Sequence, residues 1–201
     1  MNENNVKTIL LAGVGGQGTI LVSRILTHAL MAAGYDVKMS EIHGMAQRGG
    51  SVSTTVRYGP KVYSPLIGKG GADILVAFEE MEAVRWTDWL KPQGLAVVND
   101  YRIRPLPVAS GAAQYPDNCI SELEGAFRTV VVRAGEEAIR LGNPRVMNVI
   151  LLGALVQAFG MDAFDWEGAL EAQVPPKFLD INRQAFERGR QLAQEGPGSE
   201  D

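Results

Sequence analysis

The stretch GVGGQG, near the N-terminus, constrains the fold of this chain more than any other feature. It places Gly13, Gly15 and Gly18 at GxGxxG spacing between an apolar run, Val6–Gly13, and a segment with helical apolar spacing, Thr19–Ala33. A buried strand, a glycine turn and a helix form the first part of a βαβ unit. The next segment, YDVKMS, predicts the second strand. The chain is therefore expected to begin as an α/β fold.

The pattern of strands and helices continues after this unit. A β-branched, alternating segment at Ser51–Gly59 predicts a strand, and a hairpin partner is expected at Lys61–Ile67. Further strands are expected at Ala72–Glu79, Gly94–Asp100 and Arg128–Ala134, with a helix at Glu80–Leu90 and an irregular stretch at Tyr101–Phe127. Alternation of this kind predicts a doubly wound, mostly parallel, Rossmann-like α/β sheet.

The C-terminal portion is expected to be helical. Helices are predicted at Gly135–Gly142, Arg145–Phe159, Asp165–Ala172 and Pro176–Gln194. The second of these is apolar almost all round, which fits either a central buried helix or a subunit interface. Residues 1–195 are expected to form a single domain, and residues 196–201, rich in glycine and acidic groups, a disordered tail.

Composition limits the kinds of partner. A net charge of −4 argues against nucleic-acid binding. The single cysteine, Cys119, excludes an intrachain disulfide framework and a CxxC-type metal or iron–sulfur site, and no metal site is expected in this chain. No secretory leader is evident, and the longest apolar run is too short to span a membrane. A cytoplasmic protein that binds no membrane is expected.

The glycine turn has two interpretations on its own. Between a strand and a helix, GxGxxG spacing is typical of dinucleotide binding, and Glu41 stands about where the ribose-binding acid would be expected. The glycines equally serve the close crossing of a first helix over a sheet. Phosphate capture by the amides of Gly16 to Thr19 would not by itself specify NAD.

Between the second and third strands the chain carries an unusually polar stretch, EIHGMAQRGG. Together with this stretch, the segments GVGGQGTILVSRILTHAL, VYSPLIGKGGADILVAFEEMEAVR and LKPQGLAVVN resemble the gamma-type domain of the 2-oxoacid:ferredoxin oxidoreductases. The HGMAQRGG form of the loop is similar to the small subunit of the indolepyruvate branch. The resemblance covers roughly Val6 to Asn99 with high specificity.

The resemblance implies a subunit of an enzyme that oxidatively decarboxylates a 2-oxoacid to an acyl-CoA and passes the electrons to ferredoxin. Thiamine diphosphate, Mg and the Fe-S clusters would belong to a large partner subunit, and the chain alone would bind no cofactor. A heterodimer or heterotetramer is expected. No residue of this chain identifies the substrate, so the assignment of indolepyruvate as the substrate comes from the resemblance alone.

The resemblance also implies that the polar loop faces the reaction centre, near coenzyme A or near the partner's thiamine site. Arg48 suits a phosphate group through bidentate hydrogen bonds, and the Gly49–Gly50 amides suit an anion nest. The predicted cofactor-binding residues are Gly13, Gly15, Gly16, Gln17, Gly18, Gln47, Arg48, Gly49, Gly50 and Ser51.

Several roles stay open at the level of sequence. His43 is the candidate catalytic residue, through proton transfer, although a structural hydrogen bond is the alternative. For Arg48 the alternatives are an exposed loop arginine or a salt bridge to the large subunit. Glu41 would orient His43 or Arg48, or cap the turn. Two other functions compete with the enzyme subunit: a stand-alone NAD- or FAD-binding oxidoreductase, and a scaffold subunit that only docks the large chain.

Overall fold

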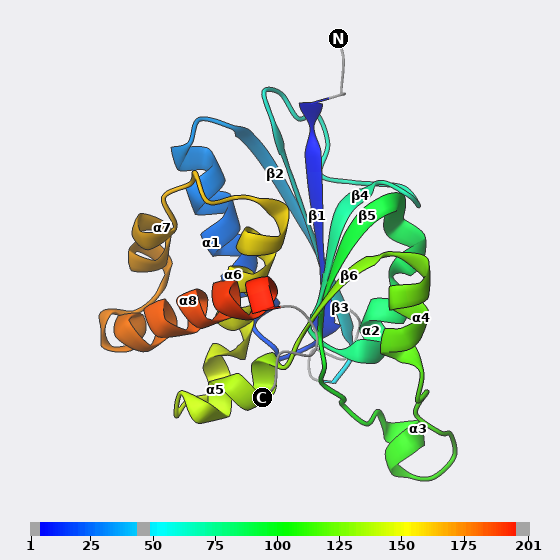
Figure 1. The fold of residues 1–201 in the computed structure, drawn as a ribbon. Helices are drawn as coiled ribbons and strands as arrows, with labels where there is room; N and C mark the ends of the chain where they lie inside the picture. The colour runs from blue at the N-terminus through cyan, green and yellow to red at the C-terminus, as the bar shows by residue number, and fades with distance from the viewer. Residues whose placement is uncertain (1–4, 44–48, 196–201) are drawn as a thin grey trace.

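The computed structural model describes residues 5–43 and 49–195, which build a sheet covered by helices on both faces (Figure 1). The sheet has six strands in the order β2-β3-β1-β4-β5-β6. The strands are β1 (Lys7–Val14), β2 (Asp36–His43), β3 (Ser51–Gly59), β4 (Ala72–Ala77), β5 (Leu90–Asn99) and β6 (Arg128–Val132). Because β1, β4, β5 and β6 pair in parallel, the predicted mostly parallel α/β sheet is confirmed.

The edge of the sheet that contains β2 departs from a simple βαβ unit. Strand β3 lies between β1 and β2 and pairs antiparallel with both. Its pairing with β1 runs from Lys7 opposite Tyr58 to Val14 opposite Ser51. Its alternate residues Val52, Val56 and Tyr58 are buried, so β3 contributes to the core as well as to the hydrogen-bond ladder. The predicted second strand therefore lies one strand away from β1.

Two helical layers enclose the sheet (Figure 1). The larger layer contains α1 (Thr19–Ala32), α5 (Ala134–Arg140), α6 (Met147–Phe159), α7 (Trp166–Gln173) and α8 (Leu179–Glu195). The opposite layer contains α2 (Glu80–Arg85) and α4 (Cys119–Ala126). Alternate strand residues face the two layers, as shown by Leu11 in the larger core and Leu10 in the smaller one. Short 3-10 turns occur at Thr87–Trp89, Pro144–Val146 and Pro176–Phe178. Helix α3 (Leu106–Ala109) lies apart from both layers (Figure 1).

Helix α6 is the central buried helix of the larger layer. Every residue from Asn148 to Val156 is buried, because α8 crosses over the side of α6 that the sheet leaves open. At the crossing, a Cβ added to Gly189 would lie 1.9 Å from the Ile150 carbonyl oxygen. Glycine is required where two helix backbones come this close. The structure supports the buried-helix interpretation of this apolar segment over the subunit-interface one.

Three expectations from the sequence are wrong in detail. Lys61–Ile67 forms no strand, since the Arg57 guanidinium donates to the carbonyls of Ser64 and Leu66 and holds the segment as a loop. Glu41 and His43 belong to β2 rather than to the polar loop, because their backbones pair with β3. The stretch Tyr101–Phe127 contains α3 and α4. The predicted tail, residues 196–201, lies outside the described residues.

Candidate functional site at the carboxyl edge of the sheet

The glycine turn joins the carboxyl end of β1 to the amino end of α1. Gly16 has φ 103° and Gly18 has φ 81°, a region of backbone conformation that favours glycine. The Gln17 side chain folds back beneath the turn: its Nε2 donates to the Phe78 carbonyl at 2.8 Å, and its Oε1 accepts from the Val14 amide at 2.7 Å. Gln17 is thus held by the protein backbone, although the sequence predicted it as a cofactor ligand.

The amides of the turn divide into two groups. Those of Gly15 and Gln17 donate to the carbonyls of Gly50 and Val14. Within residues 5–43 and 49–195, the amides of Gly16, Gly18 and Thr19 donate no hydrogen bond. These three amides stand at the N-terminus of α1, where the helix dipole favours negative charge. The turn therefore offers donors suited to a phosphate group.

The end of the polar loop lies directly against the glycine turn. The Gly15 amide donates to the Gly50 carbonyl at 2.9 Å, and Ser51 is the register partner of Val14. Gly49 has φ 79°, which turns the chain into β3. The structure thus brings together predicted site residues that are more than thirty positions apart in the sequence.

The remaining residues of the loop are placed only in part. The Ser51 hydroxyl donates to the Glu82 carboxylate of α2 at 2.5 Å, so this donor is engaged within the chain. His43 is the last residue of β2, with its backbone opposite Val52. Gln47 and Arg48 lie outside the described residues. The roles predicted for His43, Arg48 and the glycines therefore stay predictions.

Glu41 does not occupy the place of a ribose-binding acid beside the first strand. Strand β3 separates it from β1, and its carboxylate lies 3.4 Å from the Ser23 hydroxyl of α1. In dinucleotide-binding folds the acid stands at the end of the strand adjacent to the glycine turn. This arrangement weakens the case for NAD that the glycine spacing alone suggests.

Three buried glutamates of the same edge were missed by sequence reasoning. Glu79, Glu80 and Glu82 follow the end of β4, and none has more than 3% of its surface exposed. Glu79 caps α2 by accepting from the Glu82 amide at 3.0 Å. Acids in the first turn of a helix are commonplace at a solvated surface, and this makes their burial hard to foresee. The EEME run after an apolar strand was the only available indication.

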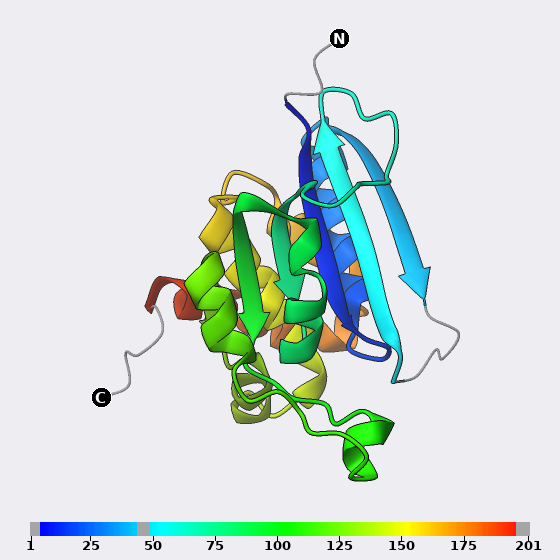
Figure 2. The same cartoon turned by 90° about the vertical axis from the view of Figure 1, so that its right-hand side faces the viewer.

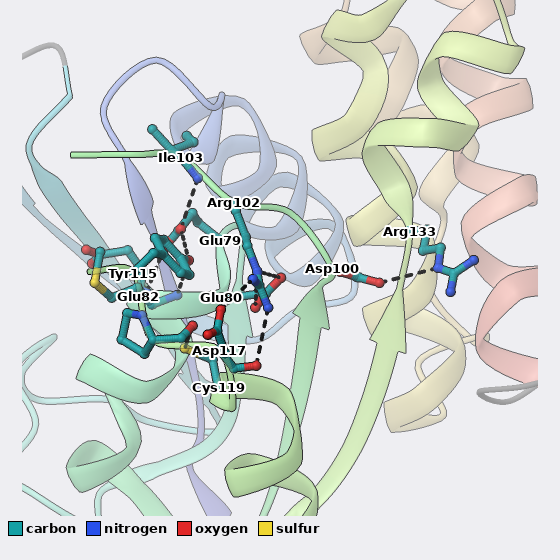
Figure 3. Close-up of polar contacts among 12 residues, drawn as sticks. Glu79, Glu80, Glu82, Asp100, Arg102, Ile103, Tyr115, Asp117, Cys119 and Arg133 are labelled. Atoms are coloured by element: carbon teal, nitrogen blue, oxygen red, sulfur yellow. Dashed lines mark hydrogen bonds and ion pairs between the residues drawn. The ribbon is translucent and has the colours of Figure 1, made fainter. Parts of the chain in front are cut away.

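The buried acids anchor an arm, defined here as residues 101–118, that projects past the carboxyl ends of the parallel strands with α3 near its tip (Figure 2). Figure 3 shows Arg102 and Tyr115 pointing toward Glu80 and Glu79. Arg102 Nε lies 3.0 Å from both Glu80 oxygens, and Tyr115 donates its hydroxyl to Glu79. The Ile103 amide donates to Glu79 at 3.1 Å.

Burial sets the protonation behaviour of this cluster. It raises the pKa of Glu80, an effect that the contact with Arg102 opposes without cancelling. Burial and the hydrogen bond to Glu79 raise the pKa of Tyr115. Cys119, 1% exposed behind the cluster, has a raised thiol pKa because of burial and the negative charges of Glu80 and Glu79. A buried thiol with a raised pKa is a poor nucleophile.

In the described part of the chain, no group of three or more His, Cys, Asp or Glu side chains has the arrangement of a metal site. None of the helices found in residues 5–43 and 49–195 is both long enough and apolar enough to cross a membrane.

Comparison with known proteins matches this chain along almost all of its length. The family model described as pyruvate ferredoxin/flavodoxin oxidoreductase matches residues 8–192. The chain is 39% identical to indolepyruvate oxidoreductase subunit IorB of Pyrococcus horikoshii, over 97% of this chain and 98% of the relative. It is 32% identical to 2-oxoglutarate synthase subunit KorC of Methanothermobacter thermautotrophicus, over 94% and 96% respectively.

Solved structures agree with these matches. The gamma subunit of a keto/oxoacid ferredoxin oxidoreductase from Geobacter sulfurreducens superposes with a TM-score of 0.68 at 25% identity, covering 94% of this chain and 99% of that one. The 2-oxoglutarate:ferredoxin oxidoreductase of Magnetococcus marinus shares the fold, with a TM-score of 0.74 at 22% identity over 96% of this chain and 32% of that one. The chain therefore belongs to the pyruvate ferredoxin/flavodoxin oxidoreductase family.

Proposed function

We propose that this chain is the small subunit of a 2-oxoacid:ferredoxin oxidoreductase that acts on indolepyruvate or a related aryl-pyruvate. The observation that carries this proposal is end-to-end similarity to indolepyruvate oxidoreductase subunits, at 39% identity over 98% of one such relative. Similarity to 2-oxoglutarate synthase subunits is weaker, at 32% identity. The reaction class is common to both groups of relatives, and the choice of indolepyruvate follows the greater identity.

The remaining parts of the enzyme are assigned to a large partner subunit. In relatives with longer chains, this chain matches only a part: 36% of ketoisovalerate oxidoreductase subunit VorA of Methanothermobacter thermautotrophicus, and 32% of the Magnetococcus marinus chain. A large subunit would bear thiamine diphosphate, Mg and the Fe-S clusters. The single buried cysteine of this chain does not provide the set of ligands that an Fe-S cluster needs. The complex would be a heterodimer or heterotetramer that delivers electrons to ferredoxin in the cytoplasm.

Within that complex, we assign to this chain a share of the coenzyme A site. Coenzyme A carries a pyrophosphate and a 3′-phosphate, and the Gly16, Gly18 and Thr19 amides form a group of donors at a helix N-terminus. The Gly49–Gly50 end of the loop adds backbone beside them. The Magnetococcus marinus enzyme, which shares this fold, was solved with 2-oxoglutarate, coenzyme A and succinyl-CoA bound. Arg48 would bind a phosphate from the loop.

The test is reconstitution of the complex from the two purified subunits. We expect reduction of ferredoxin to require both chains, an aryl-pyruvate and coenzyme A, with less than about 1% of that rate from either chain alone, because the chemistry resides on the partner's cofactors. Titration of the isolated chain with NADH, followed by fluorescence, is expected to show no tight binding. An inactive reconstituted complex, together with tight NADH binding by this chain, would instead support the stand-alone oxidoreductase.

A further inference from the structure

The glycine turn is held at its helical end by an amide side chain that no sequence pattern identifies. Asn148, in the first turn of α6, donates its Nδ2 to the Gly18 carbonyl at 3.2 Å across a separation of 130 residues. Only 5% of Asn148 is exposed, and its Oδ1 accepts from the Val149 amide at 2.9 Å. A polar group in so apolar a helix requires such partners, since burying it without them is costly.

Asn148 also limits the space around Gly18. A Cβ added to Gly18 would lie 2.3 Å from Asn148 Nδ2, so a side chain at this position would displace Asn148. The same Gly18 carbonyl accepts from the Leu21 and Val22 amides, which begin the hydrogen bonding of α1. The Asn148 contact therefore fixes the peptide group that joins Gly18 to Thr19 and contains the Thr19 N–H, one of the donors assigned to phosphate.

At its other end, the turn is held by Gln17. The Phe78 carbonyl that accepts from Gln17 Nε2 also accepts from Asn99 Nδ2 at 3.2 Å. Asn99 is fully buried, and its Oδ1 accepts from the Ala134 amide at 3.0 Å. Side-chain amides thus connect the glycine turn to the ends of β4 and β5 and to the start of α5.

We propose that Asn148 and Gln17 are positioning residues for the phosphate-binding amides of the glycine turn. This inference rests on the proposed function, because it takes coenzyme A as the phosphate-bearing ligand. Neither side chain needs to touch the ligand. They act by holding the Gly16, Gly18 and Thr19 amides in one orientation before coenzyme A arrives, so that binding does not have to order the turn.

The test compares two isosteric substitutions in the reconstituted complex, Asn148→Asp and Asn182→Asp. Asn182 is a matched control: it is 6% exposed, and its Nδ2 donates to the Phe178 carbonyl at 2.7 Å, within the C-terminal helices. Both changes remove an amide donor to a backbone carbonyl, so both should lower the melting temperature. Only Asn148→Asp is expected to raise the KM for coenzyme A, by about tenfold, which corresponds to one lost hydrogen bond.

The remaining kinetic constants distinguish a specific effect on the glycine turn from a general loss of structure in the complex. Turnover at saturating coenzyme A and the KM for the 2-oxoacid are expected to stay near wild type in Asn148→Asp. An unchanged KM for coenzyme A, or an equal rise in Asn182→Asp, would overturn the inference while leaving the proposed function intact. A wild-type complex with no coenzyme A-dependent turnover would overturn both. If the Asn148→Asp variant fails to assemble, Gln17→Glu takes its place. This change removes the donor to the Phe78 carbonyl, and the KM for coenzyme A is again compared with that of Asn182→Asp.

Discussion

Replacing Gly189 with alanine is expected to lower the free energy of unfolding by on the order of 3 kcal/mol, because overpacking here strikes backbone rather than a movable side chain. The new Cβ would stand 1.9 Å from the Ile150 carbonyl oxygen, and the reciprocal Cβ on Gly153 would stand 2.0 Å from the Phe186 carbonyl oxygen. Helices α6 and α8 would have to separate along the crossing that buries α6. Urea unfolding of the purified chain measures the loss.

Gly125 provides the matched control for this prediction. It also lies within a helix, α4, but a Cβ added there meets no atom within 4 Å. Gly125→Ala should therefore be neutral or stabilise the chain by up to about 1 kcal/mol, the ordinary helix preference for alanine over glycine. Equal stability of the Gly189→Ala and Gly125→Ala variants would show that α6 and α8 do not meet backbone to backbone.

The second large effect is expected from Glu79→Ala. This change removes the acceptor for three donors, the Tyr115 hydroxyl and the amides of Ile103 and Glu82, at a site that is 1% exposed. Leaving one buried and two partly buried donors without their acceptor and deleting the cap of α2 should together cost about 3 kcal/mol. Urea unfolding measures the total, and hydrogen exchange at the Ile103 and Glu82 amides reports the local loosening of the arm.

Glu124 serves as the control. It is an exposed glutamate on α4, in the same helical layer as α2. Glu124→Ala should change the free energy of unfolding by less than about 0.5 kcal/mol, as surface substitutions do. If Glu79→Ala and Glu124→Ala had the same free energy of unfolding, and hydrogen exchange at the Ile103 amide were unchanged, then Glu79 would not anchor the arm.

Local sequence was sufficient to predict the strands of the parallel core and the glycine turn. Apolar runs such as Ala72–Glu79 can be buried on both faces only inside a sheet covered by helices, and glycine at positions 16 and 18 is required by φ values that other residues avoid. The order of strands was not predictable in this way. The insertion of β3 between β1 and β2 depends on pairing between distant segments, which periodicity does not encode.

The candidate site was predictable only in its glycines. The contact between Gly15 and Gly50 follows from the placement of β3, and the pairing of Asn148 with Gly18 spans 130 residues, so neither leaves a local pattern. Glu79 and Glu80 were missed because consecutive glutamates ordinarily mark a solvated helix start. They are buried because the arm packs over them, with Arg102 bound to Glu80 and Tyr115 bound to Glu79.

We expect this chain to supply phosphate-binding groups for coenzyme A, and the KM for coenzyme A in the reconstituted complex measures that contribution. The variants are Arg48→Ala and Gln47→Ala, with Arg128→Ala as the control at the opposite, amino end of β6. Loss of a charge-assisted contact at Arg48 should raise the KM by about 10- to 100-fold, with a smaller rise at Gln47 and none at Arg128. Unchanged KM and unchanged turnover in both loop variants would contradict the claim and favour a subunit that serves only as a scaffold.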